Sequence, residues 1–303
     1  MAEGGLSDGW IVNRKIKFHM KRHLFILATL LVFGHTLLAQ ENDPRYSGDQ
    51  EILPLGLIET IDSKALSEKR VLNIYLPQGY HPDSSTTYPT IYVLDGSAHE
   101  DFPHIAGLAQ FMNMYQLLPQ SIVVGIANVD RYRDFTYPSK DKEDLKNLPT
   151  SGGSPKFINF LENEVQPLVE KQYKTNEHKT IIGQSLGGLL ATEILIKKPD
   201  LFNDYIIVSP SLWWDQQTLV DSAADFFKQH QDLNKKIYVS LGKEHPVMHE
   251  VADKLVEAIR NSGNEKITLF YEPILHEDHA TILHSAVYRA FKALNPQEKE
   301  PKD

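Results

Sequence analysis

Residues 180–188 read Thr-Ile-Ile-Gly-Gln-Ser-Leu-Gly-Gly, and they join two different hydrophobic patterns. An apolar β-branched run ends at Gly183, and helical spacing of apolar residues begins behind Gly187. Gly-x-Ser-x-Gly between a strand and a helix is typical of a nucleophile elbow, a tight turn that exposes a serine hydroxyl at the edge of a sheet. The glycines permit the close backbone approach that such a turn needs. We therefore predict that Ser185 is a nucleophile and that the Leu186 N–H, at the helix N-terminus, binds an oxyanion. A glycine-rich loop that matches by chance is the alternative.

The rest of the chain alternates short apolar strands with amphipathic helices, which is typical of βαβ units and a mostly parallel, doubly wound sheet with helices on both faces. The first two predicted strands are joined without a helix and suggest an antiparallel N-terminal edge. Pro167 predicts a kink or an early end of its helix. The predicted strands are Gln50–Thr60, Lys69–Leu76, Pro89–Leu94, Ile122–Ile126, 180–184, Tyr205–Val208, Lys236–Leu241 and Ile267–Tyr271, and the predicted helices are Phe102–Leu118, Ser154–Lys171, Gly187–Lys197, Gln217–His230, Val247–Asn261 and Ala280–Leu294.

The N-terminus predicts export. Lys21-Arg22-His23 precedes an apolar run, Leu24–Ala39, that ends in a small residue, as in a secretory signal peptide. Sixteen residues are short for a membrane span. Because Met20 stands directly before the basic cluster, we interpret residues 1–19 as a mis-annotated extension, 20–39 as the signal, 40–296 as one catalytic domain and 297–303 as a disordered tail. A cytosolic extension with a retained anchor helix is the alternative.

Charge excludes some partners. The chain has 31 basic and 40 acidic residues and no cysteine. Removal of residues 1–39 takes away five basic and two acidic residues, which leaves 26 and 38 and a net charge of −12. A chain this acidic is repelled by phosphate backbones and by anionic membranes, so nucleic-acid binding is not expected.

A serine nucleophile needs a base, which in turn needs a group to orient it. In this fold the acid and the histidine follow the nucleophile in the chain, at the carboxyl ends of later strands. His279 stands in His276-Glu277-Asp278-His279 after the last strand, with His276 as its rival, and Glu244 follows the preceding strand. A solvated loop carboxylate is the alternative for Glu244. Histidine pairs spaced for a metal occur at 276 and 279 and at 245 and 249, but no further ligand accompanies them, so we expect no metal or cofactor.

Further candidates lie in three loops. The second oxyanion donor should follow the early buried strand, where Asp95-Gly96-Ser97 offers the N–H of Gly96 or Ser97, unless Asp95-Gly96 is only a turn. Trp213-Trp214 could form an aromatic wall for the substrate or could cover the core, and we expect one of the two to form the wall. Arg131, in the polar segment 128–150, could hold a substrate carboxylate or phenolate, or could form a surface ion pair.

Several pieces together resemble the putative-esterase branch of the α/β-hydrolases, which includes siderophore, feruloyl and acetyl-xylan esterases, esterase D and mycolyltransferases. They are 92–96 (Tyr-Val-Leu-Asp-Gly), 130–136 (Asp-Arg-Tyr-Arg-Asp-Phe-Thr), 183–188, 209–214 (Ser-Pro-Ser-Leu-Trp-Trp) and 279–282. The resemblance implies a serine hydrolase for carboxylic esters, with Ser185 and His279 at the matching motifs. Some siderophore esterases work with a Ser–His pair alone, which leaves the need for Glu244 open. Tyr137-Pro138 departs from relatives that have proline directly after the threonine.

We therefore expect an exported, periplasmic or secreted serine esterase for a small-molecule ester such as a siderophore lactone, an aryl ester or an acylated sugar. The oligomeric state does not follow from the sequence. A peptidase on the same fold and an exported binding protein without catalysis are the rival functions.

Overall fold

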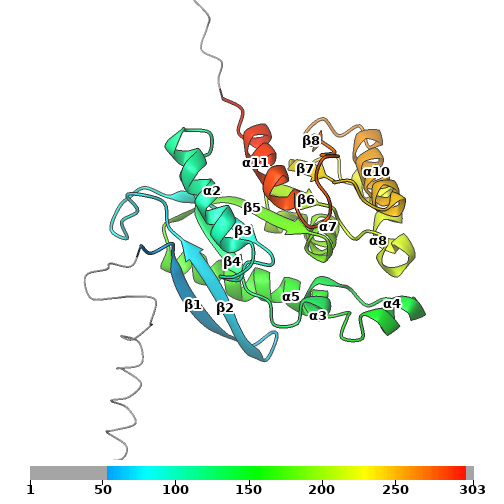
Figure 1. Cartoon of the computed structure of the whole chain (residues 1–303), viewed down its shortest axis with the longest axis horizontal. Helices are drawn as coiled ribbons and strands as arrows, with labels where there is room; N and C mark the ends of the chain where they lie inside the picture. The colour runs from blue at the N-terminus through cyan, green and yellow to red at the C-terminus, as the bar shows by residue number, and fades with distance from the viewer. Residues whose placement is uncertain (1–52, 298–303) are drawn as a thin grey trace, which may run out of the picture. The chain divides into compact units, whose positions relative to one another are not determined.

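The computed structural model describes residues 53–297, and within them one eight-stranded sheet organises the chain (Figure 1). The strand order is β1-β2-β4-β3-β5-β6-β7-β8. Every pairing from β4 to β8 is parallel, whereas β2 runs antiparallel to both β1 and β4. This confirms the mostly parallel sheet with an antiparallel N-terminal edge. The strands are β1 (Leu57–Ser63), β2 (Glu68–Tyr75), β3 (Tyr88–Val93), β4 (Ile122–Ile126), β5 (Thr175–Gln184), β6 (Asp204–Val208), β7 (Lys236–Ser240) and β8 (Thr268–Tyr271).

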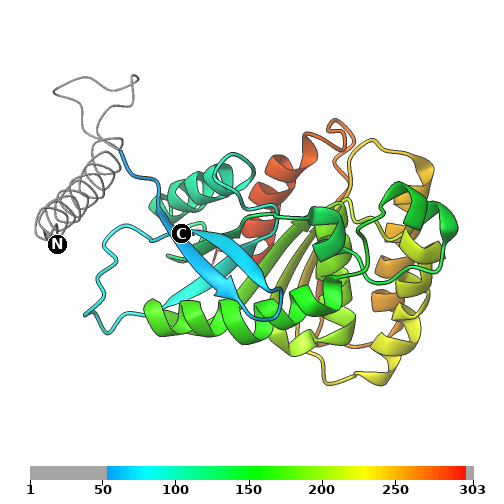
Figure 2. The ribbon, with the colours of Figure 1, turned by 90° about the horizontal axis from the view of Figure 1, so that it is seen from below.

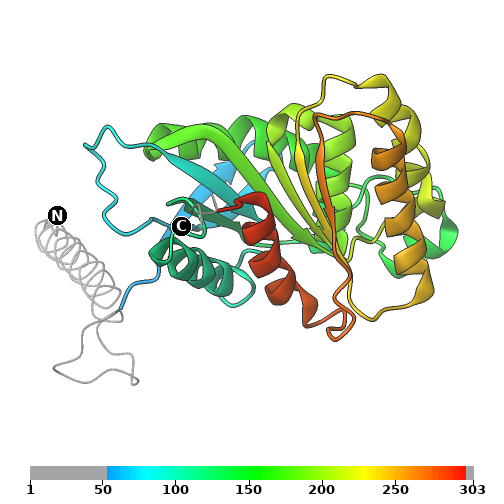
Figure 3. The ribbon, with the colours of Figure 1, turned by 90° about the horizontal axis from the view of Figure 1, so that it is seen from above.

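Helices cover both faces of the sheet, and alternate residues of the strands pack on opposite faces. On the central strand β5, Ile181 faces the layer formed by α5 to α7 and α10, and Ile182 faces the layer formed by α2 and α11. Figure 2 looks onto the α5–α6 face, and Figure 3 looks onto the α2 and α11 face. The helices are α2 (Phe102–Met114), α3 (Arg131–Phe135), α4 (Lys142–Asn147), α5 (Ser154–Phe160), α6 (Gln166–Gln172), α7 (Leu186–Lys197), α8 (Thr218–Asp221), α9 (Ala223–Gln229), α10 (Pro246–Asn261) and α11 (Ile282–Leu294), with a π turn, η1 (Leu161–Val165), and two 3₁₀ turns, η2 (Pro199–Leu201) and η3 (Trp214–Gln217).

The structure refines several predicted boundaries. The first strand begins at Leu57, after Pro54 and after Gly56, where a Cβ would lie 2.3 Å from the carbonyl oxygen of Ile74, and the predicted start at Gln50 lies outside the described residues. Pro167 does not end its helix. The α-helical hydrogen bonding instead changes to the π turn just before it and resumes in α6, which continues to Gln172.

The polar segment 128–150 contains two short helices, α3 and α4, and a partly buried ion network fixes α3 to β2. The Arg70 side chain has no solvent exposure and donates to Asp134 at 2.6 Å and to Glu68 at 2.9 Å. Arg133 bridges the same two carboxylates at 2.6 and 2.7 Å. Because a buried charge without a partner is costly, this network holds the start of the segment in place beside β2.

The predicted signal, residues 20–39, lies outside the described residues. Within residues 53–297, none of the helices is long and apolar enough to cross a bilayer.

Candidate active site

Ser185 lies in the turn between β5 and α7 and has a strained backbone conformation. Its backbone angles are φ 59° and ψ −118°, a conformation that non-glycine residues rarely adopt. A Cβ on Gly183 would lie 2.3 Å from the carbonyl oxygen of Gly187, so the chains on either side of the serine meet at a distance that only glycine allows. The turn therefore lies between sheet and helix, with the half-buried serine at its tip.

Backbone hydrogen bonds on both sides hold this turn. The Ser185 N–H donates to the carbonyl oxygen of Val208 at 3.0 Å, and the Ser185 carbonyl accepts from Ser211 at 3.0 Å and from Leu189 at 2.9 Å. Leu186 is the first residue of α7, so helix geometry gives its N–H no intrahelical partner. That N–H is thus suited to bind a negatively charged oxygen next to the Ser185 hydroxyl.

Glu244 and His279 form a pair, as the sequence predicted for the acid and the base. Nδ1 of His279 lies 2.9 Å from Oε2 of Glu244, whose side chain is only 4% exposed. The other oxygen, Oε1, accepts hydrogen bonds from the hydroxyl of Ser209 and from the Gly242 N–H at 3.2 Å. The acid is therefore no ordinary solvated loop carboxylate.

The two members of the pair change each other's ionisation. Burial raises the pKa of Glu244, but the hydrogen bonds from His279 and Ser209 outweigh it, and the net pKa is below its usual value. The pKa of His279 is raised above 6.5, chiefly by the hydrogen bond to Glu244, although burial and the nearby Arg131 guanidinium act against the rise. Because Nδ1 faces the carboxylate, Nε2 is the nitrogen left for proton exchange.

His279 lies beside the elbow but is not yet engaged with the serine. The side-chain amide of Gln184, the residue before Ser185, donates to the carbonyl oxygen of His279. Among residues 53–297, the hydroxyl of Ser185 has Ser211 as its hydrogen-bond partner, at 3.3 Å between the two oxygens, and none with a histidine. Catalytic hydrogen bonds are often long or misaligned before substrate binds, so this arrangement is compatible with a resting Ser–His pair.

The other histidine candidates lie apart from this pair. His276 is 69% exposed and lies 3.9 Å from Glu277. His245 caps the start of α10, where its Nδ1 accepts from the N–H of Val247. No group of three or more potential metal ligands occurs in the described part of the chain.

The oxyanion loop requires a correction. The N–H of Gly96 donates to the carbonyl oxygen of Ile126 at 3.0 Å, so it is already used where the loop packs against β4. A Cβ on Gly96 would lie 2.4 Å from the Cα of Gly125, which explains the glycine by packing. Of the two donors predicted from this loop, only the N–H of the buried Ser97 remains a candidate.

Arg131 is placed next to the elbow by an ion pair. Its guanidinium contacts Asp95 through Nε at 2.6 Å and through Nη2 at 2.9 Å, and Nη2 also reaches the Gln184 carbonyl at 3.3 Å. Burial lowers the pKa of Arg131, but the hydrogen bond to Asp95 outweighs it. The ion-pair alternative describes this residue better than a free substrate clamp, although its side chain is still 30% exposed.

The two tryptophans have different environments. Trp214 has no solvent exposure and donates its indole N–H to the carbonyl oxygen of Tyr137 at 2.9 Å, so it belongs to the core and the predicted substrate contact is wrong for it. Trp213 packs edge-on against Trp214 and is only partly buried. Of the two tryptophans, Trp213 is the one that keeps solvent exposure.

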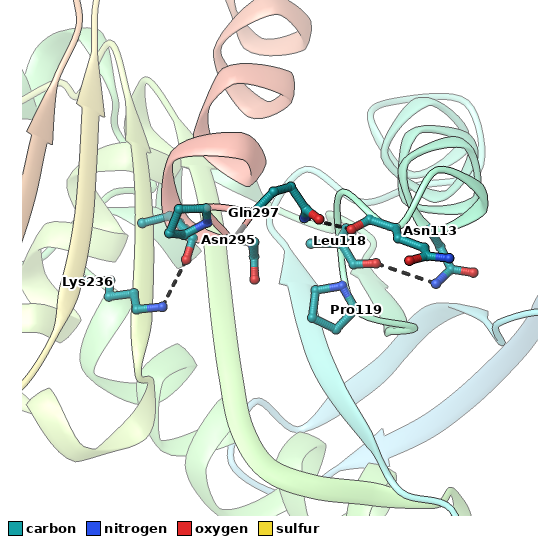
Figure 4. Close-up of a pocket in the computed structure, with 9 residues that line it drawn as sticks. Asn113, Leu118, Pro119, Lys236, Asn295 and Gln297 are labelled. Atoms are coloured by element: carbon teal, nitrogen blue, oxygen red, sulfur yellow. Dashed lines mark hydrogen bonds between the residues drawn. The ribbon is translucent and has the colours of Figure 1, made fainter. Parts of the chain in front are cut away.

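A cavity of about 530 Å³ borders the acid–histidine pair and is lined by Glu244, His279, Met248 and their neighbours. Another, of about 520 Å³, lies at the opposite end of the sheet, where Lys236 begins β7 and donates to the carbonyl oxygen of Leu294 at the end of α11 (Figure 4). We place the candidate site at the former, because the serine, the acid and the histidine all follow the carboxyl ends of strands.

Sequence reasoning named Ser209 and Ser211 only as part of a motif and gave neither a role. The available signal was their position directly after β6, the strand beside β5, at the same carboxyl edge as the elbow. It also missed Asp95 as the partner of Arg131.

Comparison with known proteins identifies the family and the fold. Residues 63–287 match the sequence model of the family described as "Putative esterase". The chain is 27% identical over 283 residues to the ferri-bacillibactin esterase BesA of Bacillus subtilis, which covers 85% of this chain and 96% of that protein. An IroE-like serine hydrolase from Shewanella oneidensis superposes with a TM-score of 0.71 at 25% identity, over 79% of this chain and 80% of that one. The BES protein from Bacillus cereus has the same fold, with a TM-score of 0.73 at 24% identity over 83% and 100% of the two chains.

We predict that Glu244→Gln lowers the pKa of His279, because the neutral amide no longer stabilises the imidazolium. An NMR titration of the histidine ring signals measures this pKa. Asp204→Asn is the matched control, since it removes a second close histidine–carboxylate pair, His178 with Asp204 at 2.9 Å, and should leave the pKa of His279 unchanged. An equal pKa of His279 in the wild type and in Glu244→Gln would contradict the pairing.

Proposed function

We propose that this chain, which belongs to the putative-esterase family and is a carboxylic-ester hydrolase, cleaves siderophore esters through an acyl-enzyme on Ser185. The observation that carries the proposal is the buried Glu244, held against His279 at 2.9 Å beside the Ser185 elbow. A serine hydroxyl is a weak nucleophile at neutral pH, and this set supplies the base and the group that orients it.

The reaction would proceed in two halves. In the first, Nε2 of His279 takes the proton of Ser185 as its oxygen attacks the ester carbonyl, and the imidazolium then returns that proton to the leaving alcohol. In the second, a water gives a proton to His279 and attacks the acyl-enzyme, and the proton passes to Ser185 as the acid product leaves. Glu244 keeps Nδ1 protonated throughout and stabilises the imidazolium.

The tetrahedral intermediates carry a negative oxygen that needs hydrogen-bond donors. The N–H of Leu186 at the start of α7 and the N–H of Ser97 are the proposed pair. Arg131 supports them indirectly: by binding both Asp95 and the Gln184 carbonyl, it ties the loop that contains Ser97 to β5, the strand that ends just before Ser185. Of the two tryptophans expected at the substrate, Trp213 is the one with a partly exposed side chain.

The substrate proposal rests on the named activity of a relative. The Bacillus subtilis protein, matched over nearly its whole length, is a ferri-bacillibactin esterase. We therefore expect a ferric siderophore with ester linkages to be a better substrate than a simple aryl ester or an acylated sugar.

We predict that Ser185→Ala lowers kcat for ester hydrolysis by about four orders of magnitude or more, because the nucleophile is lost. The assay compares ferri-bacillibactin, p-nitrophenyl butyrate and an acetylated xylo-oligosaccharide, with a p-nitroanilide to detect peptidase activity. Ser222→Ala, which removes only a hydroxyl bonded to Leu219 between α8 and α9, is the control. Wild-type turnover by Ser185→Ala would contradict the site, and faster turnover of the anilide than of every ester would favour a peptidase.

We also propose export, because Lys21-Arg22-His23 and the apolar run to Ala39 have the pattern of a signal peptide. Expression of the full chain in a Gram-negative host should give periplasmic protein whose N-terminal sequencing begins at Gln40. A retained N-terminus in the cytosolic fraction would contradict the export proposal and leave the esterase proposal intact.

A further inference from the structure

The turn Ser209-Pro210-Ser211 follows β6 and lies between the serine and the acid of the candidate site. Ser209 has a φ of 43°, a left-handed conformation that is unfavourable for a residue with a Cβ. Both serine side chains are buried, Ser209 with no exposure and Ser211 at 2%. Buried hydroxyls need hydrogen-bond partners, and the partners of these two hydroxyls belong to the candidate site.

Ser211 contacts the nucleophile. Its hydroxyl oxygen lies 3.3 Å from that of Ser185, and its backbone N–H donates separately to the Ser185 carbonyl at 3.0 Å. The backbone bond alone positions residue 211 against the elbow. The hydroxyl makes a second, separate contact, and that contact is with the oxygen expected to react.

Ser209 contacts the acid. Its hydroxyl donates to Oε1 of Glu244, the oxygen that does not face His279. Its backbone N–H is satisfied independently, by the carbonyl of Ser240 at 2.8 Å. Pro210, between the two serines, packs against α7, where a Cβ on Gly188 would lie 3.0 Å from the proline Cα. One rigid turn thus reaches both ends of the Ser185–His279–Glu244 set.

Building on the proposed function, we propose that this turn belongs to the catalytic machinery: Ser211 donates a hydrogen bond to the reacting oxygen of Ser185, and Ser209 is a positioning residue for Glu244. Ser211 keeps its own proton. As the proton of Ser185 moves to Nε2 of His279, the Ser211 hydroxyl turns its hydrogen toward the oxygen that gains negative charge. The same bond stabilises that oxygen when it leaves the acyl group during deacylation.

Ser209 acts through the histidine. A carboxylate with one oxygen held by Ser209 and the Gly242 N–H keeps its other oxygen aimed at Nδ1. Without the Ser209 hydroxyl, Glu244 loses that restraint and its bond to His279 weakens. This bond is the largest of the causes that raise the pKa of His279; the charges of Glu244 and Asp278 also raise it, and burial and Arg131 lower it. A weaker bond should therefore lower the pH at which the base becomes active.

The test measures kcat/KM for p-nitrophenyl butyrate against pH in Ser211→Ala, Ser209→Ala and Ser154→Ala. Ser154 donates to Glu193 at 2.6 Å, and both are fully buried, so it is a matched buried serine–carboxylate bond outside the site. We expect Ser211→Ala to lose about fivefold to tenfold in kcat/KM, the value of one hydrogen bond, without a shift of the pH profile. We expect Ser209→Ala to lose a similar factor and to shift the acidic limb to lower pH. Ser154→Ala should lower Tm and leave both quantities unchanged.

Two further variants keep the test decisive if an alanine variant folds poorly. Ser209→Gly removes the same hydroxyl while relieving the positive φ, and it should show the same shift of the acidic limb. Ser211→Cys keeps a weak donor of similar size and should fall between Ser211→Ala and the wild type. If the variants of Ser209 and of Ser211 keep the kcat/KM and the pH profile of an active wild type, as Ser154→Ala should, this inference is wrong and the proposed function stands. A folded wild type without esterase activity overturns both.

Discussion

The backbone conformation of Ser185 is the constraint on which the candidate site depends. A non-glycine residue at a φ of 59° costs about 1–3 kcal/mol, and the surrounding structure has to hold it there. The burial of β5 in the sheet provides this restraint. Ile181 and Ile182 are almost completely buried on opposite faces of the sheet, so packing on both sides opposes a shift of the strand that would relieve the strain at Ser185. The serine at the end of this strand therefore has one position, defined by the sheet.

Parallel register brings the other groups to that position. Gln184 pairs with Val208 on β6, and Val208 pairs with Ser240 on β7, so three strands end in one row. The residues that follow this row meet at the same edge, which is why Ser185, Ser209 and Glu244 are neighbours although up to 59 positions separate them in the sequence. The Lys243 N–H donates to the Glu277 carbonyl at 2.7 Å and joins the loop of the acid to the loop of the histidine. The acid and the histidine are thus fixed by backbone contacts as well as by their own hydrogen bond.

The sequence predicted the features that follow from local pattern and chain order. Strand–turn–helix spacing located the elbow, and the order of elements placed Glu244 and His279 after successive strands at the same edge. The sequence did not determine which N–H groups are already hydrogen-bonded. The N–H of Gly96 looks available in the sequence, but it donates to the carbonyl oxygen of Ile126 on the neighbouring strand β4. Nor did the sequence distinguish Trp213 from Trp214. The two are adjacent and identical, and only the tertiary packing determines which of them is buried. Arg131 and Asp95 are 36 positions apart, and no local pattern links them.

The central claim is that the hydroxyl at position 185 forms a covalent acyl intermediate, and mass spectrometry of quenched enzyme tests it most directly. Rapid acid quench during turnover of p-nitrophenyl butyrate, followed by trypsin, should give the peptide of residues 180–197 with the added mass of one butyryl group on Ser185. The same label should accumulate in His279→Ala only slowly, because no base activates the serine. A butyryl group on any other residue, or full turnover with no acylated peptide, would contradict the account.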